Sequence, residues 1–199
     1  MKKVPYEKED ITVTKTIRIP RRIVNKVEKL LYDRNEKFNQ LINKLLDNYA
    51  NYISKIEYIS NDKPVIISSR FFKLLTESLG QNIGTISEQA YKFGKEWGRE
   101  YLLIWNDFKI LPSGFNNIDI FLSFLQKISK YSGLFKLDLQ KEKDHVICIF
   151  HHDYNQVYSV ILGFYYKGIL ESCCGEYEII DMVTNHNNLI LKIKIREKV

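Results

Sequence analysis

The first fifty residues carry two helical patterns that are too short to bury their own apolar faces. Apolar side chains recur at intervals of three and four over residues 21–31 and 36–49, which is the spacing of one face of a helix. A domain of about forty residues normally needs disulfides, a metal or a second chain to be stable. This stretch contains no cysteine and no set of metal ligands. The simplest fold for it is therefore one half of an intertwined homodimer.

An alternating segment precedes these helices. Residues 11–19 alternate apolar and polar side chains and are rich in β-branched residues, which is typical of a strand. Pro20 ends the alternation, and its fixed φ is suited to the entrance of a helix. Asn35, between the two helical patterns, is a residue type that favours the N-cap of the second helix. The sequence predicts a strand followed by two helices.

Positive charge is concentrated in this same part of the chain. The whole chain has 30 Lys+Arg and 24 Asp+Glu, a net charge of +6. Residues 1–50 hold 12 of the basic and 7 of the acidic side chains, or +5, and the other 149 residues contribute +1. Such asymmetry indicates an N-terminal module for a polyanion and a C-terminal module with another role. A basic surface that serves solubility alone is the alternative.

The order of strand, proline and two basic amphipathic helices resembles the ribbon-helix-helix family of DNA-binding proteins. The matching segments lie within residues 11–50 and are 14–20, 21–31, 33–35 and 36–49. In that family two strands, one from each chain, pair as an antiparallel ribbon that enters the major groove. The resemblance implies a dimeric, sequence-specific transcriptional regulator that binds double-stranded DNA.

The alternation assigns the expected DNA contacts. Ile17 and Ile19 would face the helices, so the outward set expected to contact base edges is Thr14, Thr16 and Arg18. Phosphates would be held by basic side chains and by the start of the second helix, namely Arg21, Arg22, Arg34, Asn35 and Lys37. Glu36 would repel a phosphate there unless it points away or serves the cap. A ribbon that only dimerises, with Arg18 in solvent, is the alternative.

The rest of the chain predicts an α+β domain. Helical spacing covers residues 68–79, 86–103, 117–131 and 154–173, and a period of two covers 134–139, 145–150, 177–183 and 189–195. Helices, two strands, a helix and two strands indicate an antiparallel sheet with several helices. The predicted domains are the ribbon-helix-helix unit at 1–50, a linker at 51–63 and an α+β domain for dimerisation and ligand sensing at 64–199.

The hairpin–helix–hairpin order of this second domain resembles the vinyl-reductase-like, or heme/nitric-oxide-sensor-like, small-molecule-binding fold. The resemblance also rests on residues 163–171, Gly-Phe-Tyr-Tyr-Lys-Gly-Ile-Leu-Glu, followed by Gly175. It implies a pocket between helices and sheet, and hence a small-molecule effector. The aromatic residues expected to line a pocket are Phe93, Trp97, Tyr154, Tyr158 and Tyr165, with packing in the core as the alternative.

Histidines and cysteines form no strong catalytic or metal motif. His151, His152 and Asp153 lie near Cys148, but adjacent side chains at a strand end point to opposite sides, and the spacing fits no zinc motif. Paired cysteines with metal-binding spacing have no match after Gly175, and Cys173-Cys174 is more typical of packing. Walker, dinucleotide-binding, nucleophile-elbow and zincin motifs are absent from the sequence. We expect no metal, no cofactor and no enzymatic activity.

Further features bear on location and on the alternatives. No stretch approaches the roughly 18 apolar residues of a transmembrane helix, and three cysteines cannot form a complete disulfide framework. We expect a cytoplasmic protein with no membrane partner. Three other hypotheses stay open at this point: a dimerisation or partner-binding protein, a DNA partition or architectural factor without an effector, and a ligand-binding enzyme tethered to DNA.

Overall fold

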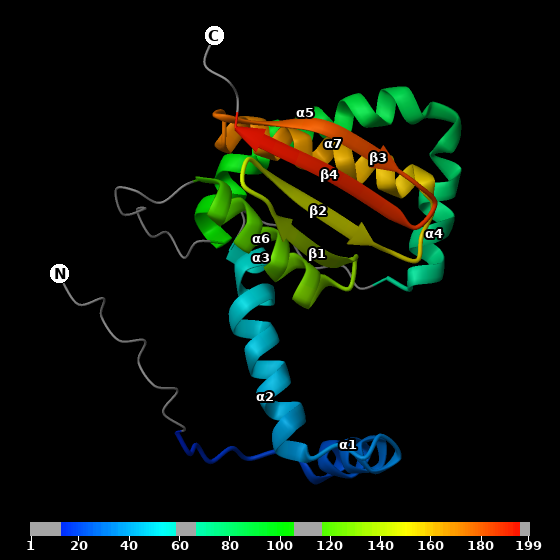
Figure 1. Cartoon of the computed structure of the whole chain (residues 1–199). Coiled ribbons are helices and arrows are strands. Elements are labelled where there is room, and N and C mark those ends of the chain that lie inside the picture. Colours follow the sequence, from blue (N-terminus) through cyan, green and yellow to red (C-terminus); the bar gives the residue numbers. More distant parts are fainter. Residues whose placement is uncertain (1–12, 59–66, 106–116, 196–199) are drawn as a thin grey trace, which may run out of the picture. The chain divides into compact units, whose positions relative to one another are not determined.

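The computed structural model describes residues 13–58, 67–105 and 117–195, which Figure 1 colours along the sequence. The chain divides into two units, residues 1–45 and 46–199. The first unit holds helix α1 (Arg21–Asp33) and most of α2 (Phe38–Asn48). The second holds the π-helical turn η1 (Tyr49–Ile53), α3 (Ser54–Tyr58), α4 (Ser69–Ser78), the 3-10 turn η2 (Gly80–Asn82), α5 (Ile83–Trp105), α6 (Asn117–Ser132), β1 (Lys136–Lys141), β2 (His145–His151), α7 (Gln156–Cys173), β3 (Tyr177–Thr184) and β4 (Asn188–Ile195).

At the junction between α1 and α2, the expected role of Asn35 as the N-cap of the second helix is wrong. Its φ of 51° is left-handed, and its N–H donates to the carbonyl of Tyr32, 3.1 Å away. The N–H of Glu36 donates to the carbonyl of Leu31 at 3.0 Å, which completes a Schellman motif. Asn35 therefore ends α1, because asparagine tolerates the left-handed region better than most residues. It is not the N-cap of α2, which begins only at Phe38.

The described part of the predicted strand is not a strand in the single chain. Residues 13–20 have no regular secondary structure, and Ile11 and Thr12 lie outside the described residues. A ribbon strand takes its hydrogen bonds from a second copy, so one chain alone offers it no pairing partner. The helix after Pro20 begins at Arg21, as expected from the proline.

The predicted linker differs from the structure over its first half. Residues 51–58 are helical, in η1 and α3, and residues 59–63 lie outside the described residues. Tyr52 and Ile56 pack against the core of the second unit. Burial of these apolar side chains explains why a polar segment continues as helix instead of running as an open joint.

The second unit is an α+β fold, as predicted. Its four strands form an antiparallel sheet in the order β1-β2-β4-β3, shown in Figure 1. The chain leaves β2, passes through α7, forms the edge strand β3 and returns as β4 between β2 and β3. The register pairs Leu137 with Phe150 and Cys148 with Leu191. These four side chains therefore share one face of the sheet.

One aromatic core holds this face to the helices. Phe150 stacks on Tyr166 of α7 with ring centroids 5.4 Å apart, and Phe121 of α6 meets the same tyrosine edge-on at 6.3 Å. All three rings are buried, at 0 to 2% exposure. Aromatic pairs in these geometries contribute beyond their buried area. Among the described residues, no helix has the length and apolar character needed to cross a membrane.

Helices α5 and α7 approach each other through glycines. A Cβ on Gly94 would lie 2.1 Å from the carbonyl oxygen of Tyr165, and one on Gly168 would lie 2.2 Å from that of Tyr91. A Cβ on Gly98 would lie 2.9 Å from the Cα of Ile169. The two backbones are thus in direct contact along this crossing, which only glycine permits.

Candidate functional site

The N-terminal unit presents its predicted DNA-contacting residues to solvent. Thr14, Thr16 and Arg18 are exposed on the irregular segment before α1. The predicted phosphate contacts are also exposed, and they lie at the start of α1 and around the α1–α2 turn: Arg21, Arg22, Arg34, Asn35 and Lys37. The structure thus leaves both sets accessible to a ligand of the size of DNA.

The start of α2 is organised differently from the expectation based on Asn35. The backbone N–H of Lys37 donates to Oε1 of Gln40 at 3.0 Å, so Lys37 takes the N-cap position. Glu36 forms an ion pair with Lys44. Its carboxylate is thus partly neutralised by a lysine two turns along α2, which reduces the repulsion that it would exert on a nearby phosphate.

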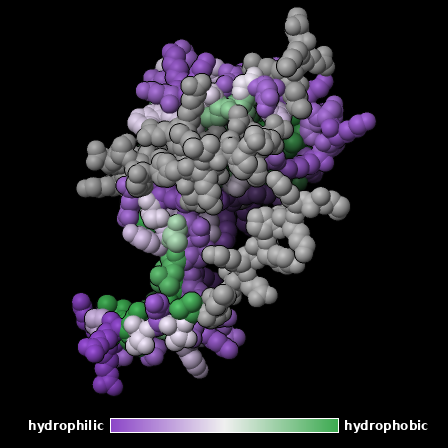
Figure 2. Space-filling model, turned by 90° about the vertical axis from the view of Figure 1, so that its left-hand side faces the viewer, coloured by the Kyte–Doolittle hydropathy of each residue, from purple (hydrophilic) through white to green (hydrophobic). Residues whose placement is uncertain are grey.

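A large apolar surface accompanies these charges. In the first unit only Leu31, at 6%, counts among the buried core residues described. The following apolar side chains of the unit are exposed by 42 to 67%: Val13, Ile17, Ile23, Leu30 and Leu45. Figure 2 shows hydrophobic surface, in green, on α1 and α2. Exposed apolar patches of this kind mark sites where another surface binds.

The five aromatics predicted to line a pocket do not gather at one site. Tyr154 and Tyr158 pack edge to face at 4.7 Å, and both are buried. Phe93 is 53% exposed and lies 5.8 Å from Trp97 on the same helix, whereas Tyr165 packs against the core from α7. Of the five, Tyr154 alone lines the pocket described next. The others belong to the core or to the surface of α5.

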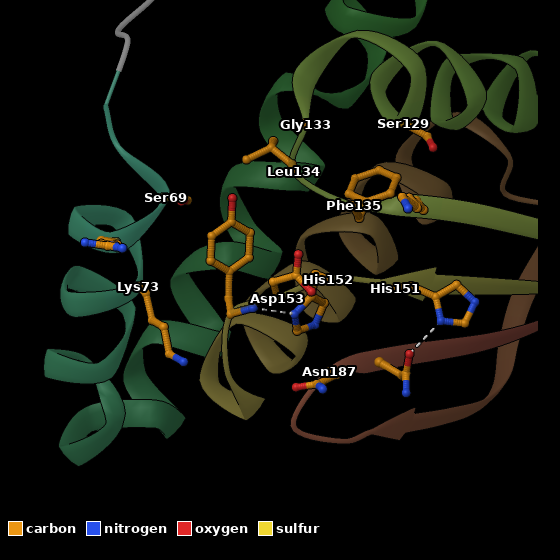
Figure 3. Close-up of a pocket in the computed structure, with 14 residues that line it drawn as sticks. Ser69, Lys73, Ser129, Gly133, Leu134, Phe135, His151, His152, Asp153 and Asn187 are labelled. Atoms are coloured by element: carbon orange, nitrogen blue, oxygen red, sulfur yellow. Dashed lines mark hydrogen bonds between the residues drawn. The ribbon is translucent and has the colours of Figure 1, made fainter. Parts of the chain in front are cut away.

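A pocket of about 690 Å³ opens between α4 and the ends of several sheet elements. Figure 3 shows its walls. Its lining residues come from α4, the last turns of α6, the α6–β1 connection and the start of β1, the end of β2, the β2–α7 connection, and the β3–β4 turn with the start of β4: Ser69, Arg70, Lys73, Ser129, Gly133, Leu134, Phe135, Lys136, His151, His152, Asp153, Tyr154, Asn187 and Asn188. The sequence did not indicate the basic members Arg70, Lys73 and Lys136, because only the fold brings Lys136 close to the two cations of α4.

His152 lines this pocket and is buried. Its Nδ1 accepts from the backbone N–H of Tyr154 at 3.3 Å, so in the neutral ring Nε2 carries the proton. Nε2 then donates to Oγ of Ser159 at 2.7 Å, and Ser159 donates to the carbonyl of Asn185 at 2.7 Å. Burial lowers the pKa of His152 to about 4, which keeps the ring neutral. The ring therefore donates to the serine and does not take its proton.

A second buried network joins the start of α7 to α4. Asn155 caps α7 by accepting from the N–H of Tyr158 at 2.9 Å, and its Nδ2 donates to Oγ1 of Thr76 at 2.8 Å. Thr76 in turn donates to the carbonyl of Lys73 at 2.9 Å. The buried side chains of Asn155 and Thr76 are both satisfied, so α4 is held against α7 by directional bonds as well as by packing.

The two adjacent histidines point to different surroundings, as expected. His151 is exposed and contacts Asp138 at 3.0 Å and Asn188 at 2.7 Å, while His152 is 6% exposed. Within the described residues, no group of three metal-ligating side chains comes together. Burial raises the pKa of both Cys148 and Cys174 to about 12, so these thiols are protonated at neutral pH.

No protein-family model matches the chain, and no curated protein matches it. A solved structure described as "Probing the function of heme distortion in the H-NOX family" aligns over 79% of this chain and 92% of that chain, with 14% identity and a TM-score of 0.42. This likeness to an H-NOX-like fold is weak and carries no argument about function. The ribbon-helix-helix resemblance of residues 11–50 stays a hypothesis.

Proposed function

We propose that the chain is a dimeric, sequence-specific DNA-binding regulator, with the N-terminal unit as its DNA-binding module. The observation that carries the proposal is the coincidence of exposed apolar and exposed basic side chains in one small unit. Burying the apolar set against a second copy would supply the stability that a unit of this size lacks. The basic set would then form one continuous surface for a polyanion.

The alternation of residues 13–19 supports readout by a two-stranded ribbon. Val13 and Ile17 alternate with Thr14, Thr16 and Arg18, so pairing with the same segment of a second copy would place the three polar side chains on one face. Arginine recognises guanine with two hydrogen bonds, and threonine bonds base edges or contacts the thymine methyl group. The basic side chains of α1 and the α1–α2 turn would hold the phosphates on either side.

Dimer formation is tested by placing a charge on the exposed apolar face. Leu30→Glu is expected to raise the dissociation constant of the dimer at least about a hundredfold, because an unpaired carboxylate would be buried between the copies. Asn25→Glu is the matched control: it adds the same charge on the opposite side of α1, where Asn25 is exposed. Sedimentation equilibrium measures both. If Leu30→Glu associates as strongly as Asn25→Glu, this face is not the interface.

Sequence readout is tested by selection from a random duplex library followed by binding titrations. Arg18→Ala is expected to weaken binding to the selected site by about 1–3 kcal/mol and to relax discrimination at one base position. Lys15→Ala is the matched control, since Lys15 occupies the other face of the alternation. It should leave the discrimination between selected and random DNA unaltered, because a side chain on that face would not reach the base edges.

The outcome separates the proposal from its nearest alternative. Equal affinity of wild type and Arg18→Ala for selected and random DNA would contradict ribbon readout. Binding without any enriched sequence would instead fit a partition or architectural role. Absence of DNA binding at low salt would favour a dimerisation module whose basic surface recognises an acidic protein.

A further inference from the structure

We propose that the pocket beside α4 binds a small organic anion in which a phosphate group is joined to a planar apolar body. Binding of such an anion does not depend on the proposed DNA-binding function. Its role as the effector of the regulator does rest on that function. The pocket is assigned from three features: its charge, its walls and its connection to α2.

The described side chains that line the pocket carry a net positive charge. Arg70, Lys73 and Lys136 line it, against the single carboxylate of Asp153. None of the three cations forms an ion pair with an acidic side chain within the part of the chain that the structure describes, and Lys73 is half-buried. Gathering like charges at a concave surface costs Coulombic energy, which a bound anion would remove. Figure 3 shows Lys73 extending from α4 toward the wall that carries Asp153 and Asn187.

The walls favour a small molecule over duplex DNA. Tyr154 and Phe135 are 8% and 3% exposed and supply apolar surface, while Ser129 and Asn187 supply hydrogen-bonding groups. The volume of about 690 Å³ lies within the range of cavities that enclose drug-sized ligands. A concave site of this size admits an aryl or nucleoside phosphate but not a DNA duplex, whose major groove alone is about 12 Å wide.

The pocket lies next to the contacts between the last turn of α2 and the end of α6. Ser129 lines the pocket, and the next two residues, Lys130 and Tyr131, contact the carboxylate of Asp47 at 3.1 and 3.0 Å. Asp47 lies in the last turn of α2, and the Lys130 ammonium lowers the pKa of its carboxyl group. A ligand that shifts the end of α6 would therefore act on the residues that hold α2. This is the route by which an anion could change DNA affinity.

Binding is tested on the full-length protein by isothermal titration calorimetry with two pairs of charged and neutral compounds. The pairs are phenyl phosphate with phenol, and adenosine monophosphate with adenosine, and inorganic phosphate is titrated as well. We expect at least one phosphate ester to bind with a dissociation constant at least tenfold lower than that of its neutral partner and that of inorganic phosphate. Lys73→Gln should raise this constant about tenfold. Lys143→Gln, in the exposed β1–β2 turn, makes the same change of charge and should leave it unaltered.

Several results would overturn the proposal. These are failure of both esters to bind up to 10 mM, equal affinity for the neutral partners, and equal binding by Lys73→Gln and wild type. Weaker binding of random DNA by Lys73→Gln, with phenyl phosphate binding unaltered, would assign Lys73 to the DNA surface and would also overturn it. The DNA titrations with Arg18→Ala are independent of these measurements, so failure of the regulator hypothesis is recognised separately.

Discussion

Replacing Gly94 with alanine is expected to lower the free energy of unfolding of the second unit by about 3 kcal/mol, at the upper end of the usual cost of overpacking. The added methyl group would lie 2.1 Å from the carbonyl oxygen of Tyr165, which belongs to the backbone of α7 and cannot rotate away. The helices must therefore move apart along the crossing. Gly168→Ala should have a comparable effect, because its Cβ meets the backbone of α5 at Tyr91 and Lys95.

A substitution in the same helix supplies the control. Gly84 also lies in α5, but a Cβ there meets nothing within 4 Å. Gly84→Ala should be neutral or slightly stabilising, since alanine has the higher helix propensity. Urea unfolding followed by tryptophan fluorescence reports on this region, because both tryptophans of the chain, Trp97 and Trp105, lie on α5. Equal midpoints for Gly94→Ala and Gly84→Ala would show that α5 and α7 do not cross at these glycines.

The free energy of unfolding should decrease as the pH falls from 6.5 to 4, by at most about 3 kcal/mol from His152. Its pKa is about 4 in the folded chain, against an ordinary value of 6.5. Between these pH values the unfolded chain binds a proton at this site and the folded chain does not, so protonation favours unfolding. Above pH 6.5 this contribution to stability is fully present, and below pH 4 no further loss comes from this group.

Urea unfolding at intervals between pH 7.5 and 4 measures this dependence. Carboxylates whose pKa is lowered in the folded protein, such as Asp47 and Asp144, lose their contribution over a more acidic range. His152→Gln should remove the part of the slope between pH 6.5 and 4. His186→Gln, at an exposed position in the β3–β4 turn, should retain most of it, because His186 lowers the pKa of His152 less than burial does. Parallel curves for His152→Gln and wild type would mean that the ring of His152 is accessible to protons in the folded state.

The sequence by itself determined the local elements of the second unit. Periods of 3.6 and 2 are set by which side chains one helix face or one strand face must bury, so they can be read without knowing the partner. Helices α4, α6 and α7 and the two hairpins begin and end within a few residues of the predicted ranges. The antiparallel character of the sheet followed as well, because short turns can connect only antiparallel neighbours.

The tertiary structure alone decided the order of the strands and the composition of the pocket. The placement of β4 between β2 and β3 depends on which strand edges meet after α7 has packed, and no local pattern encodes that choice. Arg70 and Lys136 are 66 positions apart, and each by itself is an ordinary surface cation. Asn35 shows the same limit at short range: its type suits both a helix start and a left-handed helix end. The backbone conformation of the α1–α2 turn shows that Asn35 ends a helix. In the same way, the close contact with α5 explains why position 168 must be glycine.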